Sequence, residues 1–449
     1  MKRLFMACIA VATISACGSE SNFPQATGKS NVWSINAIPT SPEIGFSIEE
    51  RTIAGIFYTD NSVPQEWDDL EYTFNFDAVI PPEPGLTRIA SEFLDVIRDM
   101  DYIFLLWGEL TTPTVTIWEK PQRTFDGSES FFEFRVGHAA ESVGTVDVYY
   151  ALEGVAPAVG EQFATLAPGE VSATADFESD SYVLTVTAPD DPSTVLYQSV
   201  ASNVLAAQSV VAPIFEGGAN NSAPLIAKII NMQGQSVTLP DANGMPTARY
   251  VHATMDLATS DIYDDAALTN QIVANLAFGD ATGDIDMPVG DVPLTFTAAG
   301  NPGAILFEST LTSSLGIRRN YYITVDTTAD PDALIGVPQV VDRRSVETLA
   351  RLTFFHSAIN NQVVDLYVVD SGETIDEELP RQIQMPYRTQ TPAVSLGEGS
   401  FDVYITTSGE KTILDGPVPL DTVLGGVYEA VLLDRVDPAL AEFKILAPP

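Results

Sequence analysis

Short stretches of alternating apolar and polar residues recur along the whole chain. Residues 131–139 alternate apolar side chains with charged or small ones, and residues 182–187 alternate apolar residues with hydroxyl-bearing ones. Residues 146–150 and 363–369 are rich in β-branched and aromatic residues. A period of two is typical of a strand that buries one face.

Clusters of turn-forming residues separate these stretches. They occur at residues 188–192, 360–361, 397–399 and 425–426,. Many short strands at close intervals predict an all-β fold in which pairs of sheets pack as β-sandwiches.

One phrase occurs three times and defines a repeat. Each of the three histidines of the chain is followed by an aspartate nine residues later and by a tyrosine eleven residues later. The residues are His138, Asp147 and Tyr149; His252, Asp261 and Tyr263; and His356, Asp365 and Tyr367. Successive histidines are 114 and 104 residues apart, which is the size of an independently folding domain,. We therefore predict tandem copies of one unit, each with its own core.

A fourth, divergent copy is predicted before the first histidine. Counting back by a similar step reaches Asn36-Ala37, in a segment that lacks both the histidine and the aspartate. The joins near residues 125–129, 240–246 and 342–347 contain glycine, proline or charge and have little to bury. The predicted domains are residues 31–127, 128–243, 244–346 and 347–449, and we expect them to form a rod, with a folded-back cluster as the alternative.

One segment of the first copy competes with this interpretation. Apolar residues between Leu86 and Met100 follow helical spacing,. The corresponding stretches of the later copies, residues 195–199, 305–309 and 412–416, resemble strands. We therefore predict a strand or turn there as well.

The first residues have the layout of a secretory signal. Lys2 and Arg3 are followed by an apolar run of thirteen residues, 4–16, which is too short for a membrane span,. Elsewhere no apolar stretch approaches membrane length. We predict export of the chain.

The end of this signal resembles the lipobox of bacterial lipoproteins. Residues 14–17 read Ile-Ser-Ala-Cys. The resemblance implies cleavage after residue 16, a lipid on Cys17 and, because Gly18 follows, an outer-membrane destination. Residues 18–30 are polar and suit a flexible tether. The alternative is an ordinary signal peptide with an incidental cysteine.

Cysteine content and charge narrow the setting further. Cys8 lies in the signal segment, so the mature chain has no disulfide and depends on its cores for stability,. The formal net charge is −40 and is spread along the chain. Nucleic acid and anionic lipid surfaces are therefore disfavoured partners. The charge is typical of a surface that is solvated in a salty medium.

The histidine–aspartate–tyrosine triplet has a structural and a catalytic interpretation. Each histidine projects from a mostly apolar strand face. If the strand turns back directly, histidine and aspartate become cross-strand partners with the tyrosine beside them, although Val146 and Val148 do not fit that register. No Gly-x-Ser-x-Gly or His-Glu-x-x-His motif occurs,. We favour a structural pair that pins the first hairpin, and we predict no catalytic residue, metal ligand or cofactor.

Acidic loops offer a separate possibility. Asp280, Asp284 and Asp286 lie close together, and four more aspartates, residues 256, 261, 264 and 265, lie upstream. Calcium favours such oxygen ligands, but the spacing is not that of an EF-hand. A solvated loop is the default interpretation and calcium binding the alternative.

The repeated phrase resembles a known bacterial domain family. Residues 135–149, echoed at 249–263 and 351–367, are similar to the opening motif of a family of unknown function that occurs in lipoproteins and other exported proteins. The resemblance implies Ig-like β-sandwiches and a cell-envelope setting. The Pro-Asp that usually follows the family's His-Ala-Ser is absent here.

The sequence therefore predicts a lipid-anchored envelope protein of four tandem sandwiches that binds or scaffolds without catalysis. Its expected partners are the membrane, through the lipid, and an envelope or extracellular protein or glycan. The alternatives are a calcium-tuned adhesin and an accessory or hydrolytic module that uses the histidine–aspartate pairs.

Overall fold

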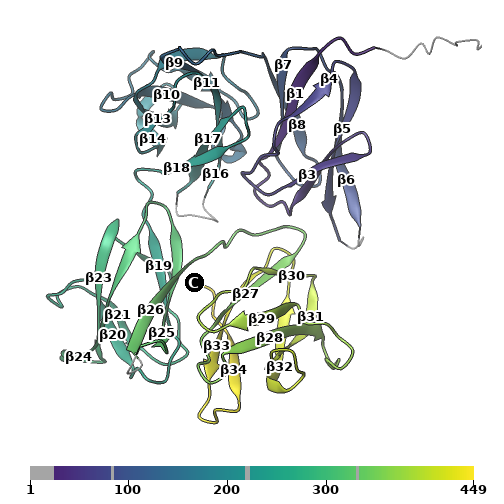
Figure 1. Cartoon of the computed structure of the whole chain (residues 1–449). Coiled ribbons are helices and arrows are strands. Elements are labelled where there is room, and N and C mark those ends of the chain that lie inside the picture. The colour runs from purple at the N-terminus through teal and green to yellow at the C-terminus, as the bar shows by residue number, and fades with distance from the viewer. Residues whose placement is uncertain (1–24, 82–84, 218–222, 330–332) are drawn as a thin grey trace, which may run out of the picture.

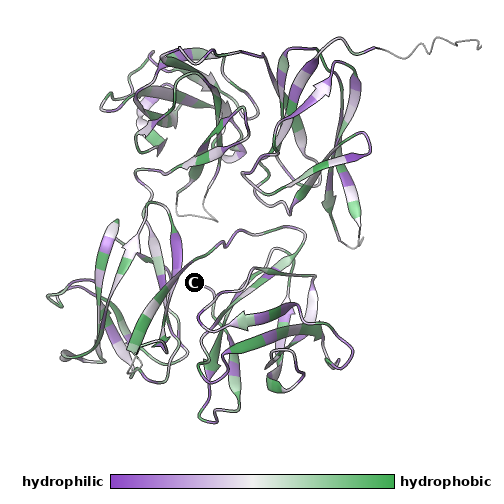
Figure 2. Cartoon of the chain, viewed as in Figure 1, coloured by the Kyte–Doolittle hydropathy of each residue, from purple (hydrophilic) through white to green (hydrophobic). Residues whose placement is uncertain are grey.

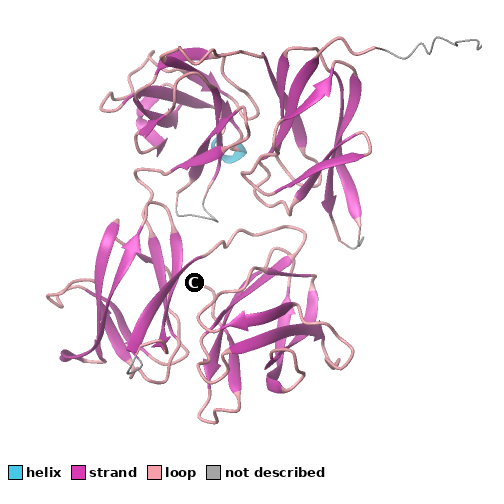
Figure 3. Cartoon of the chain, in the orientation of Figure 1, coloured by secondary structure: helices cyan, strands magenta, loops and turns pink. Residues whose placement is uncertain are grey.

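The computed structural model describes residues 25–81, 85–217, 223–329 and 333–449. Their strands form eight separate sheets, and a single 3-10 turn, Glu141–Val143, lies in the second repeat (Figure 3). The predicted all-β architecture of repeated units is thereby confirmed. None of the described segments forms a helix of the length and hydropathy that a membrane span requires. The predicted signal and Cys17 lie outside the described residues.

The strands fall into four successive repeats (Figure 1). The first contains β1 (Lys29–Asn36), β2 (Ile44–Ile48), β3 (Arg51–Ile56), β4 (Gln65–Asp68), β5 (Glu71–Val79), β6 (Leu86–Asp95), β7 (Met100–Trp107) and β8 (Thr114–Pro121). The second contains β9 (Phe131–His138), β10 (Val146–Leu152), β11 (Ala164–Leu166), β12 (Ala175–Glu178), β13 (Ser181–Ala188), β14 (Asp191–Gln198), β15 (Ser202–Asn203), β16 (Ser209–Glu216), β17 (Leu225–Asn231) and β18 (Ser236–Leu239).

The other two repeats follow the same plan. The third contains β19 (Thr247–His252), β20 (Ser260–Tyr263), β21 (Gln271–Leu276), β22 (Ile285–Asp286), β23 (Gly290–Ala298), β24 (Asn301–Ser313), β25 (Arg318–Asp326) and β26 (Ala333–Val340). The fourth contains β27 (Ala350–His356), β28 (Val363–Asp370), β29 (Gln382–Pro386), β30 (Val394–Leu396), β31 (Gly399–Thr407), β32 (Ile413–Thr422), β33 (Val427–Asp434) and β34 (Ala441–Ile445).

Every repeat has two sheets that share a four-stranded order, to which the second repeat adds one strand in each sheet. We call sheet I the sheet that contains the first strand of a repeat, and sheet II the other. In the first repeat, sheet I has the order β4-β1-β7-β8 and sheet II the order β3-β2-β5-β6. The first strand pairs in parallel with the seventh in the first, third and fourth repeats, as β1 does with β7, and with the eighth, β16, in the second repeat. The segment with helical spacing forms the edge strand β6, which confirms the prediction of a strand.

A separate hydrophobic core fills the space between the two sheets of each repeat. In the second repeat, Phe134 of sheet I stacks on Tyr150 of sheet II with 3.9 Å between ring centroids. Figure 2 shows hydrophobic residues along the strands of all four repeats. Each repeat thus has the cross-section of a sandwich.

The outer faces of sheets I are also apolar, and they join the repeats in pairs. Trp33, Ile103 and Trp118 of the first repeat pack against Val211 and Phe215 of the second. The third and fourth repeats meet through a corresponding cluster, in which Tyr322 and Phe355 stack with 3.9 Å between ring centroids. Sheet I of each repeat is therefore buried on both faces.

The two pairs close on one another, so the expectation of a rod is wrong. Arg344, which precedes the fourth repeat, donates from Nη1 to the carbonyls of Pro39 and Ser41 in the first repeat at 3.1 and 2.5 Å. The backbone N–H of Glu347 donates to the carbonyl of Thr40 at 2.8 Å. Figure 1 accordingly shows a compact arrangement of four repeats with the C-terminus near its centre. The physical reason is that the linker before the fourth repeat folds back onto the first repeat, where the buried guanidinium of Arg344 satisfies two backbone carbonyls,.

Gly137 provides a test of the pairing between the first two repeats. An ideal Cβ at this position would lie 2.1 Å from Cη2 of Trp118 across the interface. We expect Gly137→Val to lower the free energy of unfolding by about 1–3 kcal/mol, because the indole must move out of a packed interface. Thermal unfolding of residues 18–449 measures the loss.

The matched control is Gly397→Val, because no heavy atom lies within 4 Å of an ideal Cβ there. The control should melt like the wild type. An unchanged melting temperature for Gly137→Val would show that the repeats do not pack through this face.

Candidate functional site

Each histidine of the repeated phrase ends the first strand of its repeat, where the chain leaves sheet I and crosses to sheet II. All three side chains are 0% exposed. Nε2 of His138 lies 2.7 Å from the carbonyl oxygen of Gly144, and Nε2 of His356 lies 2.7 Å from that of Asn361. In the third repeat, the corresponding distance from His252 to the carbonyl oxygen of Ala258 is 3.3 Å. Each imidazole therefore holds the crossover loop to the strand.

These contacts fix the protonation of the rings. A carbonyl oxygen only accepts, so Nε2 carries the proton. Nδ1 of His138 and of His356 accepts from the N–H two residues later, that of Ala140 at 3.4 Å and of Ala358 at 3.3 Å. Burial lowers the pKa of His138 and of His252, and it lowers the pKa of His356 to about 4,. The imidazoles are neutral at pH 7.

Asn36 takes the same place in the divergent first repeat. It ends β1, its Oδ1 accepts from the N–H of Ile38 at 3.1 Å, and its Nδ2 donates to Oγ of Ser41 at 2.9 Å. The amide thus provides the acceptor and the donor that the imidazole provides elsewhere. Counting the repeat spacing had located this residue, and the structure gives it an equivalent role.

The predicted pairing of histidine with aspartate is wrong. The two residues lie in different sheets, because the connection after the first strand crosses between sheets and does not turn back within one. Asp147 bonds within sheet II instead. It accepts from Oγ1 of Thr165 on β11 at 2.5 Å and from the N–H of Asp190, in the turn between β13 and β14, at 2.8 Å.

The other two aspartates act in the same way. Asp261 accepts from the N–H groups of Asn275 and Gly300, each at 2.8 Å. Asp365 accepts from those of Gln384 and Gly409 at 2.7 and 2.8 Å. The aspartates therefore tie sheet II together and do not orient the imidazoles.

The tyrosines of the phrase lie beside the aspartates and away from the histidines. Val146 and Val148 enter the core, so Asp147 and Tyr149 share the outer face of sheet II,. In the fourth repeat, Tyr367 lies in a small outer cluster, and Nζ of Lys411 lies 5.8 Å from its ring centroid. The histidine of each triplet thus stabilises the crossover loop, while the aspartate and the tyrosine belong to sheet II.

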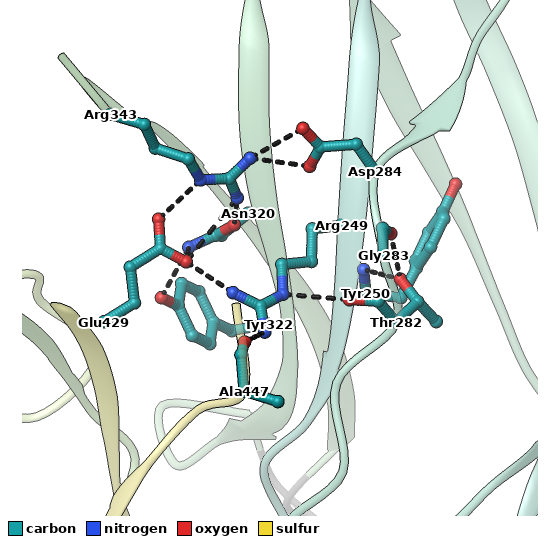
Figure 4. A network of polar contacts seen from close by, with 10 residues as sticks. All are labelled: Arg249, Tyr250, Thr282, Gly283, Asp284, Asn320, Tyr322, Arg343, Glu429 and Ala447. Atoms are coloured by element: carbon teal, nitrogen blue, oxygen red, sulfur yellow. Dashed lines mark hydrogen bonds and ion pairs between the residues drawn. The ribbon is translucent and has the colours of Figure 1, made fainter. Parts of the chain in front are cut away.

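A buried network of charges joins the third and fourth repeats (Figure 4). Glu429 on β33 accepts from Nη1 of Arg249 at 2.7 Å, from Nε of Arg343 at 2.8 Å and from Nδ2 of Asn320 at 3.1 Å. Nη1 of Arg343 continues the network to Asp284 at 2.6 Å. Removing one member of such a network leaves a buried charge without its partner, so the network fixes how the two repeats dock.

The sequence did not reveal this network. Arg249 alternates with core residues and so resembled an exposed position. Its burial depends on the neighbouring repeat, which pattern alone does not place.

The acidic loop considered for calcium is partly engaged with cations of the chain itself. Asp284 pairs with Arg343, and Oδ1 of Asp280 lies 3.6 Å from Nζ of Lys444. Among the described residues, no group of three or more histidine, cysteine or carboxylate ligands has a geometry suited to a metal ion.

A groove of about 940 Å³ lies between the first and fourth repeats, and we call it the 1–4 groove. It is lined by Pro42, Glu43, Gly45, Thr52, Ala54, Gly55, Phe57, Tyr58, Val79, Leu86, Asp342, Arg344, Val346, Leu349, Arg351, Ala393 and Ser395. Its volume is near the upper end of the range for ligand sites. Arg344, which bonds to carbonyls of the first repeat, is one of its lining residues.

Comparison with known proteins yields no family. No family model matches the chain, and no curated protein matches it. Among solved structures, the Bacillus anthracis TIE protein is similar at 8% identity, over 91% of this chain and 68% of that chain, with a TM-score of 0.15. A similarity of this size carries no implication for fold or function.

The neutral, buried histidines predict a specific dependence of stability on pH. The pKa of His356 is about 4 in the folded protein and about 6.5 in the unfolded chain,. Between these values the unfolded chain binds more protons, so folding stability falls as the pH is lowered from 6.5 towards 4. The loss for this one group is on the order of 3 kcal/mol.

We expect His356→Asn, which copies the natural Asn36, to remove this loss. The other titrating groups are shared by both proteins and cancel in the difference. Urea unfolding between pH 4 and pH 7 measures the free energy of unfolding of both proteins. The variant should become more stable relative to the wild type as the pH falls. A difference that is constant with pH would mean that His356 is not buried in its neutral form.

Proposed function

We propose that this chain is a lipid-anchored protein of the bacterial cell envelope that binds or scaffolds a partner without catalysis, through four tandem Ig-like sandwiches. The 1–4 groove is the observation that carries the proposal. It is a concave, mainly apolar site at a junction between repeats, where ligand sites commonly occur,. The partner proposed is a protein or glycan of the envelope or its surroundings.

The Ig-like assignment is supported by the sheets of each repeat. Two sheets pack around one core, and the chain crosses between them directly after the first strand. Such sandwiches commonly present loops and edges for recognition, while their cores serve stability.

The non-catalytic role is supported by the partners of the repeated phrase. Histidine and aspartate, the pair that would serve as general base and its orienting carboxylate, are engaged separately with backbone and hydroxyl groups of their own repeat. This arrangement suits maintenance of the fold in each copy.

The lipid anchor is supported by the residues before the first strand. The apolar run of residues 4–16 and Cys17 precede a polar segment, and β1 begins at Lys29. A tether of this length would let the four repeats extend away from the membrane surface. The outer membrane is the destination that we propose.

Cells that express wild type or Cys17→Ser test anchoring and binding together. With labelled palmitate and an amine-reactive cross-linker, we expect the wild type to carry label, to sediment with outer membranes and to form a discrete cross-linked complex. Cys17→Ser should lose both the label and the sedimentation, because it has no thiol to acylate. An unlabelled, soluble wild type would overturn the anchor, and the absence of any cross-linked complex would overturn the binding role.

A further inference from the structure

We propose that the 1–4 groove binds an extended, uncharged peptide segment of a protein partner, which adds a strand to the free edge of β3. This inference rests on the proposed binding function and names the chemistry of its partner. It follows from the sheet edges, the backbone, the charge and the exposed side chains of the groove.

Two sheet edges border the groove. β3 is the outer strand of sheet II in the first repeat and pairs only with β2, while β30 is the outer strand of sheet I in the fourth repeat and pairs only with β27. Within the described part of the chain, no strand pairs with the other side of either. An edge strand presents N–H and C=O groups that an extended peptide can pair with.

The wall formed by the first repeat is bare at Gly45, whereas the side chain of Glu43 covers Gly55, with Oε1 1.7 Å from an ideal Cβ there. Gly45 of β2 lies directly opposite Gly55 of β3, and both line the groove. The nearest atoms to an ideal Cβ at Gly45 are those of Asp77, at 3.5 Å or more. Glycine within a strand is found where another backbone approaches closely, which suits an added main chain.

The charge of the groove differs from that of the chain. Its lining has two acidic residues, Glu43 and Asp342, and two basic ones, Arg344 and Arg351, on a chain of net charge −40. Arg351 pairs with Asp342 at 2.9 Å, and Arg344 is engaged with carbonyls of the first repeat. No net charge is left to recognise an anionic or cationic ligand, so an uncharged segment is the complementary one.

Three apolar side chains at the groove are exposed in a way that suits contact with a partner. Phe57 is 53% exposed, Val79 46% and Leu86 68%. They line the same groove as Arg344, which joins the first and fourth repeats. Alternate apolar residues of an added strand would cover them and contribute specificity. A glycan would need more polar partners than this surface offers.

The test uses residues 18–449 and a display library of linear nine-residue peptides as the probe. We expect enrichment of uncharged peptides with alternating apolar residues. Methylating alternate backbone nitrogens of a selected peptide should weaken its binding about tenfold or more, because the ladder hydrogen bonds are lost while the side chains remain. Gly45→Trp, which fills the groove, should weaken binding to a similar extent.

The control is Gln271→Trp on β21, the edge strand of the third repeat that corresponds to β3, which should bind like the wild type. Phe57→Ser and Leu86→Ser are exposed substitutions that test the same surface if Gly45→Trp fails to fold. Each should weaken binding about fivefold.

Several results would overturn the inference. The first are the absence of any enriched peptide and a preference for charged peptides. The inference also fails if the N-methylated peptide binds as well as its parent, or if Gly45→Trp binds peptide as well as the wild type. Binding of a glycan by the wild type that Gly45→Trp abolishes would also contradict it. If Gly45→Trp still forms the cross-linked complex in cells, the groove assignment is wrong while the binding function stands. If the wild type forms no complex either, both proposals fall.

Discussion

The architecture depends on one constraint, which is that sheet I of each repeat is apolar on both faces. One face closes the core of its own repeat. The other would expose a large apolar surface to water, and such surfaces are normally covered. Consecutive residues are buried in residues 32–36 of β1 and in residues 429–434 of β33. A sheet with one solvent-exposed face would instead alternate buried and exposed residues. The repeats consequently fold as two pairs, the first with the second and the third with the fourth.

The crossover between sheets is the second requirement of each unit. The chain leaves sheet I at the end of its first strand, and a single buried side chain provides one donor and one acceptor to the loop that follows. A neutral imidazole provides both in the second and fourth repeats and the donor in the third, and a carboxamide provides both in the first. The imidazole and the carboxamide hold the loop with similar geometry, but only the imidazole can gain a proton in the range of pH 4 to 7. The stability of the crossover loop therefore depends on pH only in the repeats that carry histidine. The aspartate of the phrase serves sheet II, which explains why histidine and aspartate recur together without touching.

Much of this fold is predictable from the sequence, and what is not has physical reasons. Alternation located β9 and β13, β-branched and aromatic content located β10 and β28, and comparison of repeats assigned β6 correctly despite its helical spacing. The partner of His138 was missed because spacing does not show whether a short connection turns back or crosses to another sheet. Arg249 and Glu429 were missed because their burial comes from a neighbouring repeat. The 1–4 groove depends on the placement of repeats far apart in the sequence, about which local pattern carries no information.

Closure of the two pairs also creates the candidate site. Arg344 sits in the linker before the fourth repeat and reaches carbonyls of the first, so the linker itself forms one wall of the groove. The proposed recognition site is therefore a property of the assembled repeats, and a single repeat would lack it.

The most direct test of this account is small-angle X-ray scattering by monomeric residues 18–449, because the apolar outer faces of sheets I pair the repeats and the contacts of Arg344 and Glu347 with the first repeat close the two pairs into a compact arrangement. The account predicts a radius of gyration close to the roughly 22 Å of a compact chain of this length, with a single-peaked distance distribution. A much larger radius with the extended tail of four repeats in a row would contradict it.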